Sequence, residues 1–242
     1  MSLIAIGDIH GCPATLDALL ARLAPGSGDH LVFIGDYIDR GPDSKAVIDR
    51  LLVLRDEEPP ACTFLRGNHE ALMLDYLAGG SNGDGSNGDG SNGDGRSKVQ
   101  ATQALRLWQQ NGGGTTLRSY ANEQTARLPE AHVAFVQATD LYYETPDFFF
   151  VHAGLDPRRT VRESVEQESE RTLLWTRDHF QAPEVAWEKP VVCGHTPQRQ
   201  PIDREKLIAI DTGCVYHRRP GLGRLTAVHL PERKFVSVEY EG

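Results

Sequence analysis

The chain has 242 residues, 39% of them hydrophobic, which is enough to bury a sizeable core, and we expect one α/β domain spanning residues 1–242. Its formal net charge of −9 argues against a general nucleic-acid binder, because such proteins neutralise phosphates with lysine and arginine. No apolar run approaches the roughly 18 residues that span a bilayer, and four cysteines lack CxxC spacing, so we expect no membrane role, reduced thiols and a cytoplasmic location.

The first third of the chain repeats a cycle of apolar strand, polar turn and helix. Short apolar runs predict strands at residues 3–6, 31–34 and 62–65. Apolar residues at helical spacing predict helices at residues 14–23, 44–54 and 70–77, the first of them directly behind Pro13. This alternation favours a largely parallel sheet, whose ligands bind beyond the carboxyl ends of the strands.

Further strands are predicted in the second half of the chain. Apolar runs at 148–151 and 191–193 end at His152 and His195. Three strands in a row, at 207–210, 224–229 and 234–240, predict a second, mixed sheet packed on the first.

Between these halves lie an insert at 79–98 and a helical segment at 99–138. Residues 81–95 repeat Ser-Asn-Gly-Asp-Gly three times without an apolar residue, which predicts a disordered spacer. Residues 99–138 are expected to form helices, broken at 112–114, that cap the site.

Three polar runs directly follow the first three predicted strands. They are Gly7-Asp8-Ile9-His10-Gly11, Gly35-Asp36-Tyr37-Ile38-Asp39-Arg40-Gly41 and Gly67-Asn68-His69-Glu70. Each alone is a weak signal, because an Asp-x-His pair at a strand end is more often a turn beside a surface histidine. The ordered set, with one predicted helix and one strand in each gap, favours a metal centre.

Two cations can be assigned to these residues. Asp8 and His10 point to the same side of an extended backbone, so one metal can take both. The two oxygens of Asp36 can bridge a pair of cations roughly 3.5 to 4 Å apart. The second cation would be completed by three side chains: Asn68, His152 and His195.

A general acid and a phosphate clamp are also predicted. His69 lies beside Asn68, so its ring can protonate a leaving alkoxide, and Asp39 can accept a hydrogen bond from its other nitrogen. Arg40 and Arg66 can present planar forks to phosphate oxygens. The alternative for Asp39 and Arg40 is an ordinary surface ion pair in a turn.

Together with His152-Ala153-Gly154 and Gly194-His195-Thr196, these runs resemble the phosphoprotein phosphatase family, bacterial type, of the calcineurin-like metallophosphoesterases. The resemblance runs from about Ile4 to about Ala227, outside the insert. It implies a four-layer α/β/β/α sandwich with two mixed sheets. It also implies a dinuclear centre in which Asp8, His10 and Asp36 hold the first metal, and Asp36, Asn68, His152 and His195 the second.

The resemblance extends to the acid, the clamp and the metal. It pairs His69 with Asp39 and makes Arg40 and Arg66 phosphate ligands. Arg177, in Leu-Leu-Trp-Thr-Arg, resembles a third phosphate-binding arginine of the family, although it could instead cap a helix end. The mixed oxygen and nitrogen ligands suit manganese, iron or zinc, and manganese is preferred because bacterial members commonly depend on it. Asp211-Thr212-Gly213 matches another family run, interpreted as support for the ligand histidines.

The expected reaction is phosphoester hydrolysis by direct in-line attack of a metal-bridging hydroxide. The preferred function is a serine/threonine protein phosphatase acting on a phosphorylated protein or small phosphoester, because tetraphosphate hydrolases usually carry Ala at Asp39 and Asp at Glu70. Residues 216–220 also differ from that branch's Trp-Gly-Gly. The alternatives are a symmetrical dinucleoside tetraphosphate hydrolase and a catalytically silent phosphoprotein-binding module, which would require a lost ligand or acid.

Overall fold

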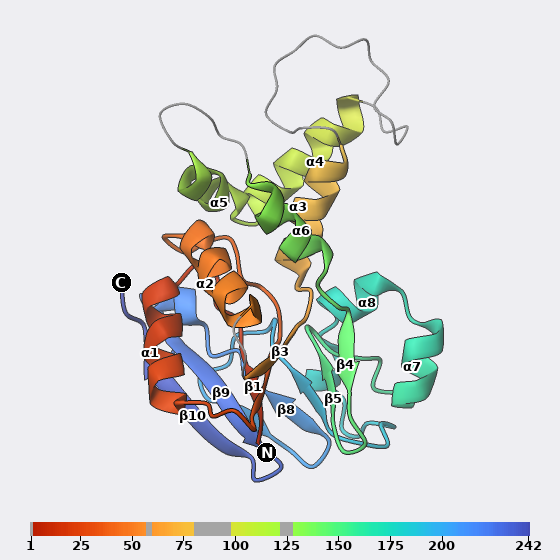
Figure 1. Ribbon diagram of the computed structural model, residues 1–242. Coiled ribbons are helices and arrows are strands. Elements are labelled where there is room, and N and C mark those ends of the chain that lie inside the picture. The colour runs from red at the N-terminus through yellow and green to blue at the C-terminus, as the bar shows by residue number, and fades with distance from the viewer. Residues whose placement is uncertain (1, 57–59, 80–97, 122–127) are drawn as a thin grey trace.

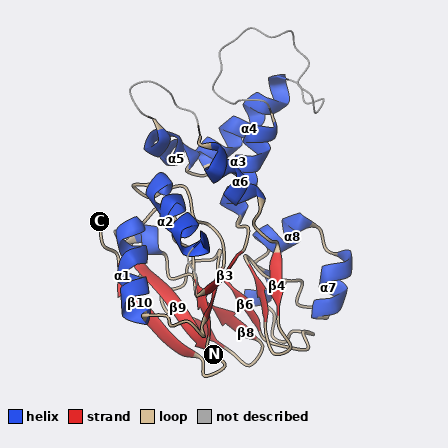
Figure 2. Ribbon diagram, in the orientation of Figure 1, coloured by secondary structure: helices blue, strands red, loops and turns tan. Residues whose placement is uncertain are grey.

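The computed structural model of the chain describes residues 2–56, 60–79, 98–121 and 128–242 (Figure 1). The spacer predicted at 81–95 therefore lies outside the described residues. The described chain forms two five-stranded sheets with helices on either side of the pair (Figure 2). No helix in these described ranges is both long and apolar enough to cross a membrane.

The first sheet has the strand order β10-β9-β1-β2-β3. Its strands are β1 (Leu3–Ile6), β2 (His30–Phe33), β3 (Ala61–Phe64), β9 (Arg224–Leu230) and β10 (Lys234–Glu239). β1, β2 and β3 are parallel, whereas β9 runs antiparallel to both β1 and β10. The helices that follow its three parallel strands are α1 (Pro13–Leu23), α2 (Ser44–Asp56) and α3 (Asn68–Ala78).

The second sheet has the order β4-β5-β6-β8-β7. Its strands are β4 (Tyr142–Glu144), β5 (Phe149–Val151), β6 (Val191–Cys193), β7 (Ile202–Asp203) and β8 (Leu207–Ala209). β5, β6 and β8 are parallel, and an antiparallel strand closes each edge. The short helices α7 (Val161–Gln167) and α8 (Glu170–Trp175) lie between β5 and β6 in the chain.

The prediction that the last three strands share the second sheet is wrong for two of them. β8 does join the second sheet, but β9 pairs with β1 and continues into β10. The register joins Leu3 to Leu230, residues from opposite ends of the chain. An antiparallel strand can add to the free edge of a parallel sheet at any distance in the sequence, so strand order along the chain could not decide the partner.

Alternating side chains divide the core into three apolar layers. In β1, Ile4 and Ile6 pack against α1 and α2, while Ala5 faces the second sheet. In β5, Phe150 packs between the sheets, while Phe149 faces α7 and α8. Because successive residues of a strand point to opposite faces, both sheets are covered on both sides. The four-layer α/β/β/α sandwich follows.

Three further helices stand with α3 at one end of the sandwich (Figure 1). They are α4 (Lys98–Gln110), α5 (Gly113–Tyr120) and α6 (Glu130–Gln137). The chain turns between α4 and α5 at Gly112, whose φ of 113° lies in the region that favours glycine. A cap function for these helices stays a prediction.

Candidate metal centre

The six predicted ligands lie just beyond the carboxyl ends of five parallel strands. Asp8 and His10 follow β1, Asp36 follows β2, and Asn68 begins α3 after β3. The second sheet contributes His152 after β5 and His195 after β6. All six side chains are buried, and the most exposed, His195, shows 7% of its surface.

The turn after β2 is strained and is held by one buried carboxylate. Asp36, Asp39 and Arg40 have φ values of 53°, 72° and 69°, which non-glycine residues seldom adopt. Glu70 accepts hydrogen bonds from the backbone N–H of Asp36 and Tyr37, at 2.9 and 2.8 Å. It also accepts the N–H groups of Ile38 and Gly67. These contacts show that Glu70 shapes the turn that carries Asp36.

Asp36 lies at the centre of the cluster. Its Oδ2 is 3.5 Å from His10 Nε2, and its Oδ1 is 3.4 Å from His152 Nε2. Two groups of side chains could each hold a metal ion, with all ligand atoms within 4.8 Å of one another. They are His10, Asp36 and His69, and Asp36, His152 and His195. Burial raises the pKa of Asp36, but the charges that His152, His69 and His10 carry when protonated outweigh it, so the net direction is downward.

The hydrogen bonds of two histidines leave lone pairs directed at Asp36. His10 Nδ1 is 2.9 Å from the carbonyl oxygen of Ile38, and His152 Nδ1 is 3.0 Å from that of Ile34. Burial lowers the pKa of both histidines, which keeps the rings neutral, so each has one N–H to donate to its carbonyl. Each Nε2 lone pair then faces a carboxylate, and this donor set fits a cation placed between them.

Asn68 and His195 extend the same arrangement. Asn68 Oδ1 lies 2.9 Å from both His152 Nε2 and His195 Nδ1. Burial, followed by the charge of His152, lowers the pKa of His195 to about 2. His195 Nε2 is buried and has no hydrogen-bond partner among the described residues. The Asn68 oxygen and the neutral ring nitrogens of His152 and His195 therefore lie close together, and a divalent transition metal could bind such a set of ligands.

Asp8 joins the two sheets and adds a second buried carboxylate. It accepts the backbone N–H of His195 with both oxygens, at 3.2 and 3.0 Å. Burial raises its pKa well above the usual range, and Asp211 and Asp36 add to the effect. Burial likewise raises the pKa of Asp211 to about 7. Crowded buried carboxylates are costly unless cations offset them, which the predicted metals would do.

Asp211 was interpreted as support for the ligand histidines, but its observed hydrogen bonds lie elsewhere. Its Oδ1 accepts the N–H of Gly213 at 2.8 Å, and its carbonyl accepts the N–H of Gln198. Its influence on the cluster is electrostatic, through the pKa of Asp8.

His69 and Asp39 form a fully buried pair. The Nδ1–H of His69 donates to Asp39 Oδ2 at 2.6 Å. His69 Nε2 is left without a hydrogen-bond partner in the described chain and lies 4.0 Å from Asp36 Oδ2. Since both side chains are 0% exposed, the ordinary surface ion pair considered for Asp39 does not describe it.

Two residues that the sequence reasoning missed hold Asp39 from the helical segment. Trp108 Nε1 donates to both Asp39 oxygens, at 3.1 and 2.9 Å. Thr116 Oγ1 donates to Asp39 Oδ1 at 2.6 Å. Helical spacing could have indicated that both side chains are buried, but not that they meet a carboxylate some 70 residues earlier in the chain.

The three predicted phosphate-binding arginines lie in different surroundings. Arg40 donates to His10 Nε2 at 2.6 Å, so it already reaches the cluster. Arg66 instead donates to the carbonyls of Gln137 and Thr139 and lies 3.6 Å from Glu170. Its guanidinium is occupied away from the predicted ligands, and a phosphate role would require it to leave these partners.

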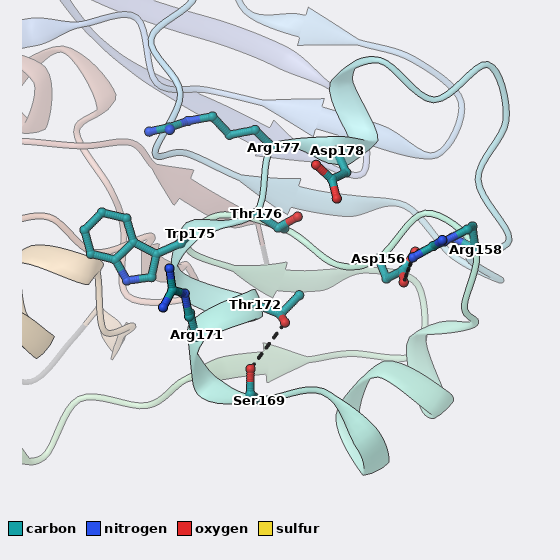
Figure 3. A pocket seen from close by; sticks show the side chains of 9 residues that line it. All are labelled: Asp156, Arg158, Ser169, Arg171, Thr172, Trp175, Thr176, Arg177 and Asp178. Atoms are coloured by element: carbon teal, nitrogen blue, oxygen red, sulfur yellow. Dashed lines mark hydrogen bonds and ion pairs between the residues drawn. The ribbon is translucent and has the colours of Figure 1, made fainter.

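Arg177 is exposed at the edge of a cavity of about 640 Å³ (Figure 3). It donates to Thr196 Oγ1 at 3.2 Å. Figure 3 shows Arg177 and Trp175 extending to the same side, while Arg158 pairs with Asp156 at the opposite end. The Trp175 ring centroid is 5.8 Å from that of His195, so this side of the cavity borders the predicted metal ligands.

Residues 1–224 match the calcineurin-like phosphoesterase family. Serine/threonine-protein phosphatase 1 of Salmonella typhimurium is 30% identical over 226 residues, covering 91% of this chain and 90% of that protein. The asymmetrical bis(5'-nucleosyl)-tetraphosphatase PrpE of Halalkalibacterium halodurans is 28% identical over 261 residues, covering 96% and 92%.

The similarity of this chain to solved structures concerns the fold alone. The cold-active protein-tyrosine phosphatase of a Shewanella species superposes with a TM-score of 0.59, covering 99% of this chain and 78% of that one at 17% identity. The sandwich fold and the family resemblance inferred from the polar runs are confirmed. The chain belongs to the calcineurin-like metallophosphoesterase family, and it is a metal-dependent phosphoester hydrolase.

Proposed function

We propose that this phosphoesterase is a serine/threonine protein phosphatase with a dinuclear centre. The observation that carries the proposal is the buried His69–Asp39 pair beside Asp36. An alanine at position 39, usual in tetraphosphate hydrolases, would leave His69 Nδ1 without its partner. The Asp39 carboxylate accepts hydrogen bonds from three side chains outside its own turn, which supports a role for the His69–Asp39 pair in catalysis. They are His69, Trp108 and Thr116.

The proposed first cation is held by Asp8, His10 and Asp36. The proposed second cation is held by Asp36, Asn68, His152 and His195. A bound pair of cations supplies an attacking hydroxide near neutral pH and polarises the phosphoryl oxygens. Manganese is the first choice for both positions, with iron or zinc as alternatives.

The proton transfer is assigned to His69. Because Nδ1–H donates to Asp39, the free Nε2 is the atom directed at Asp36. A protonated Nε2 there can donate to a leaving alkoxide, and Asp39 stabilises the charge on the ring. Arg40 is assigned to the non-bridging phosphate oxygens, for which it exchanges its contact with His10. Arg177 approaches from the side of His195 and is assigned the same function.

Dinucleoside tetraphosphate hydrolysis is the second candidate. It is favoured by the similarity to PrpE over nearly the whole chain, although PrpE is named as an asymmetrical hydrolase and the alternative expected from the sequence was a symmetrical one. A silent phosphoprotein-binding module is less well supported, because all six predicted ligands and the predicted acid are present in one buried cluster.

Two assays separate these functions. Hydrolysis of p-nitrophenyl phosphate, with and without added manganese, tests for a phosphoesterase, and no turnover with any divalent ion would leave the silent module. The kcat/KM for a phosphoserine peptide is then compared with that for diadenosine tetraphosphate. The proposal expects the peptide to be preferred, and a clear preference for the tetraphosphate would reverse it.

A further inference from the structure

Two hollows meet beside the metal centre, and both are basic. They share Arg40, Gly41 and Pro42 and have volumes of about 340 and 330 Å³. The first is completed by Thr115, Arg118 and Ser119, and the second by Val215, Tyr216, His217, Arg218, Arg219 and Tyr240. We call the two together the arginine groove. Its lining contains four arginines and no carboxylate.

The absence of carboxylates is unusual for this protein, whose formal charge is −9. Several arginines elsewhere are paired with carboxylates, such as Arg50 with Asp17 at 2.9 Å and Arg233 with Asp203 at 2.8 Å. Within the described part of the chain, no carboxylate lies at ion-pair distance from Arg218 or Arg219. Their guanidinium groups are therefore available to an anion from outside.

The loop that carries these arginines is held in place before any ligand arrives. The Arg219 guanidinium carbon lies 4.5 Å from the centroid of the Tyr216 ring, and that of Arg40 lies 5.7 Å from it. The N–H of Tyr216 donates to Gly213, and the N–H of Arg219 donates to Tyr216, both at 2.8 Å. The His217 ring stacks on Tyr240 with centroids 3.9 Å apart. A loop ordered in this way loses little entropy on binding.

Arg40 connects this groove to the reacting centre. Its guanidinium touches His10 on one side and faces Tyr216 on the other. A phosphate held by Arg40 would therefore place the neighbouring part of the substrate over the groove. Exposed guanidinium forks there match carboxylates in charge and geometry.

We propose that the arginine groove binds acidic side chains next to the phosphorylated residue, so that the preferred substrate is an acidic phosphopeptide. The proposal rests on the protein phosphatase function proposed above. Arg218 and Arg219 are the specificity residues, and the Tyr216 ring contacts the guanidinium groups of both Arg219 and Arg40.

The test uses two phosphoserine peptides that differ only in their flanking residues, glutamate in one and alanine in the other. With the full-length manganese-loaded enzyme, we expect kcat/KM to be about tenfold higher for the acidic peptide, as two exposed charge pairs would give. The double variant Arg218→Gln/Arg219→Gln should reduce this ratio to about two. Raising the salt concentration should reduce the wild-type ratio, because exposed charges are screened.

The matched control is Arg162→Gln, which removes one exposed charge on α7, outside the groove. It should keep the wild-type ratio between the two peptides. Equal kcat/KM for both peptides in the wild-type enzyme would overturn the groove proposal, as would an unchanged ratio in the double variant.

Failure of the function itself would look different. If p-nitrophenyl phosphate is hydrolysed but neither peptide is, each peptide is measured as an inhibitor of p-nitrophenyl phosphate hydrolysis. The two inhibition constants then decide whether the groove binds acidic side chains. A stronger inhibition by the acidic peptide that the double variant abolishes would support it, and equal inhibition would refute it. Loss of diadenosine tetraphosphate hydrolysis in the double variant, without any peptide discrimination, would assign the groove to polyphosphates and refute the peptide proposal.

Discussion

The two sheets contribute to the candidate metal cluster in different ways. The first sheet supplies the carboxylates, the amide and His10 from its own turns, with Glu70 accepting hydrogen bonds from the N–H groups around Asp36. The second sheet supplies two histidines whose positions depend on the first sheet. His152 donates to the carbonyl of Ile34, and the N–H of His195 donates to Asp8. One half of the cluster is therefore built by its own loops, and the other half by contact between the sheets.

Two glycines permit close contacts at this cluster, Gly194 between the two sheets and Gly67 within the first sheet. A Cβ on Gly194 would lie 2.0 Å from Asp8 Oδ1, and one on Gly67 would lie 2.2 Å from Asp36 Oδ1. Any side chain at either position would push a predicted ligand out of place.

Among changes to the residues that the first sheet contributes, Asp36→Asn should have the largest effect on activity. The change removes the charge shared by both predicted cations, and a bound metal contributes several kcal/mol to transition-state stabilisation. We expect activity on p-nitrophenyl phosphate to fall by at least about 1,000-fold. Elemental analysis should find fewer than two metals per chain, whereas the exposed control Asp17→Asn should retain them. Two tightly bound metals in Asp36→Asn would show that the bridge is wrongly assigned.

His69→Ala tests the acid while leaving the predicted metal ligands in place. We expect a loss of about 100-fold in kcat on alkyl phosphates, the lower range of general acid catalysis. Aryl phosphates should lose far less, because a good leaving group needs little protonation. Steady-state kinetics on a matched alkyl and aryl pair measures the difference, and equal losses on both would refute the acid role.

The second-sheet half should be sensitive to acid in the metal-free protein. Burial lowers the pKa of His195 to about 2, whereas an unfolded histidine titrates near 6.5. As the pH falls below 6.5 the unfolded chain gains a proton that the folded chain refuses, so stability decreases. Between pH 6.5 and pH 5 this histidine should cost about 2 kcal/mol of unfolding free energy.

Denaturant unfolding of the metal-free protein at both pH values measures this loss. His195→Asn cannot take up the proton in either state, so its stability should fall by about 2 kcal/mol less over the same interval. The double difference cancels the opposing contribution of Asp211, whose raised pKa of about 7 favours the folded state at low pH. Identical pH dependence in the two proteins would contradict the burial argument for His195.

The smallest effect is expected from the helical segment that holds Asp39. Trp108→Phe removes the Nε1–H donor but keeps an aromatic ring, and we expect kcat on alkyl phosphates to fall about fivefold. Trp187→Phe is the matched control, because its Nε1–H donates to the carbonyl of Asp156 on the far side of the second sheet. A loss equal to that of the control would mean that the contact with Asp39 has no part in catalysis.

The sequence alone was sufficient for features that depend on neighbouring residues. Asp8, His10, Asp36 and Asn68 were predicted because each follows an apolar run, and carboxyl ends of parallel strands meet at one edge. The alternation that separates Ala5 from Ile4 and Ile6 is likewise a local property of extended backbone.

Tertiary structure alone decided which distant segments meet. β9 adds to β1 from the other end of the chain, Trp108 and Thr116 reach Asp39 from separate helices, and Arg66 is bound by Thr139 instead of facing the cluster. Periodicity shows which face of an element is buried, but it does not name the partner. The partner is selected by packing and by the need to satisfy buried polar groups, and both depend on the whole fold.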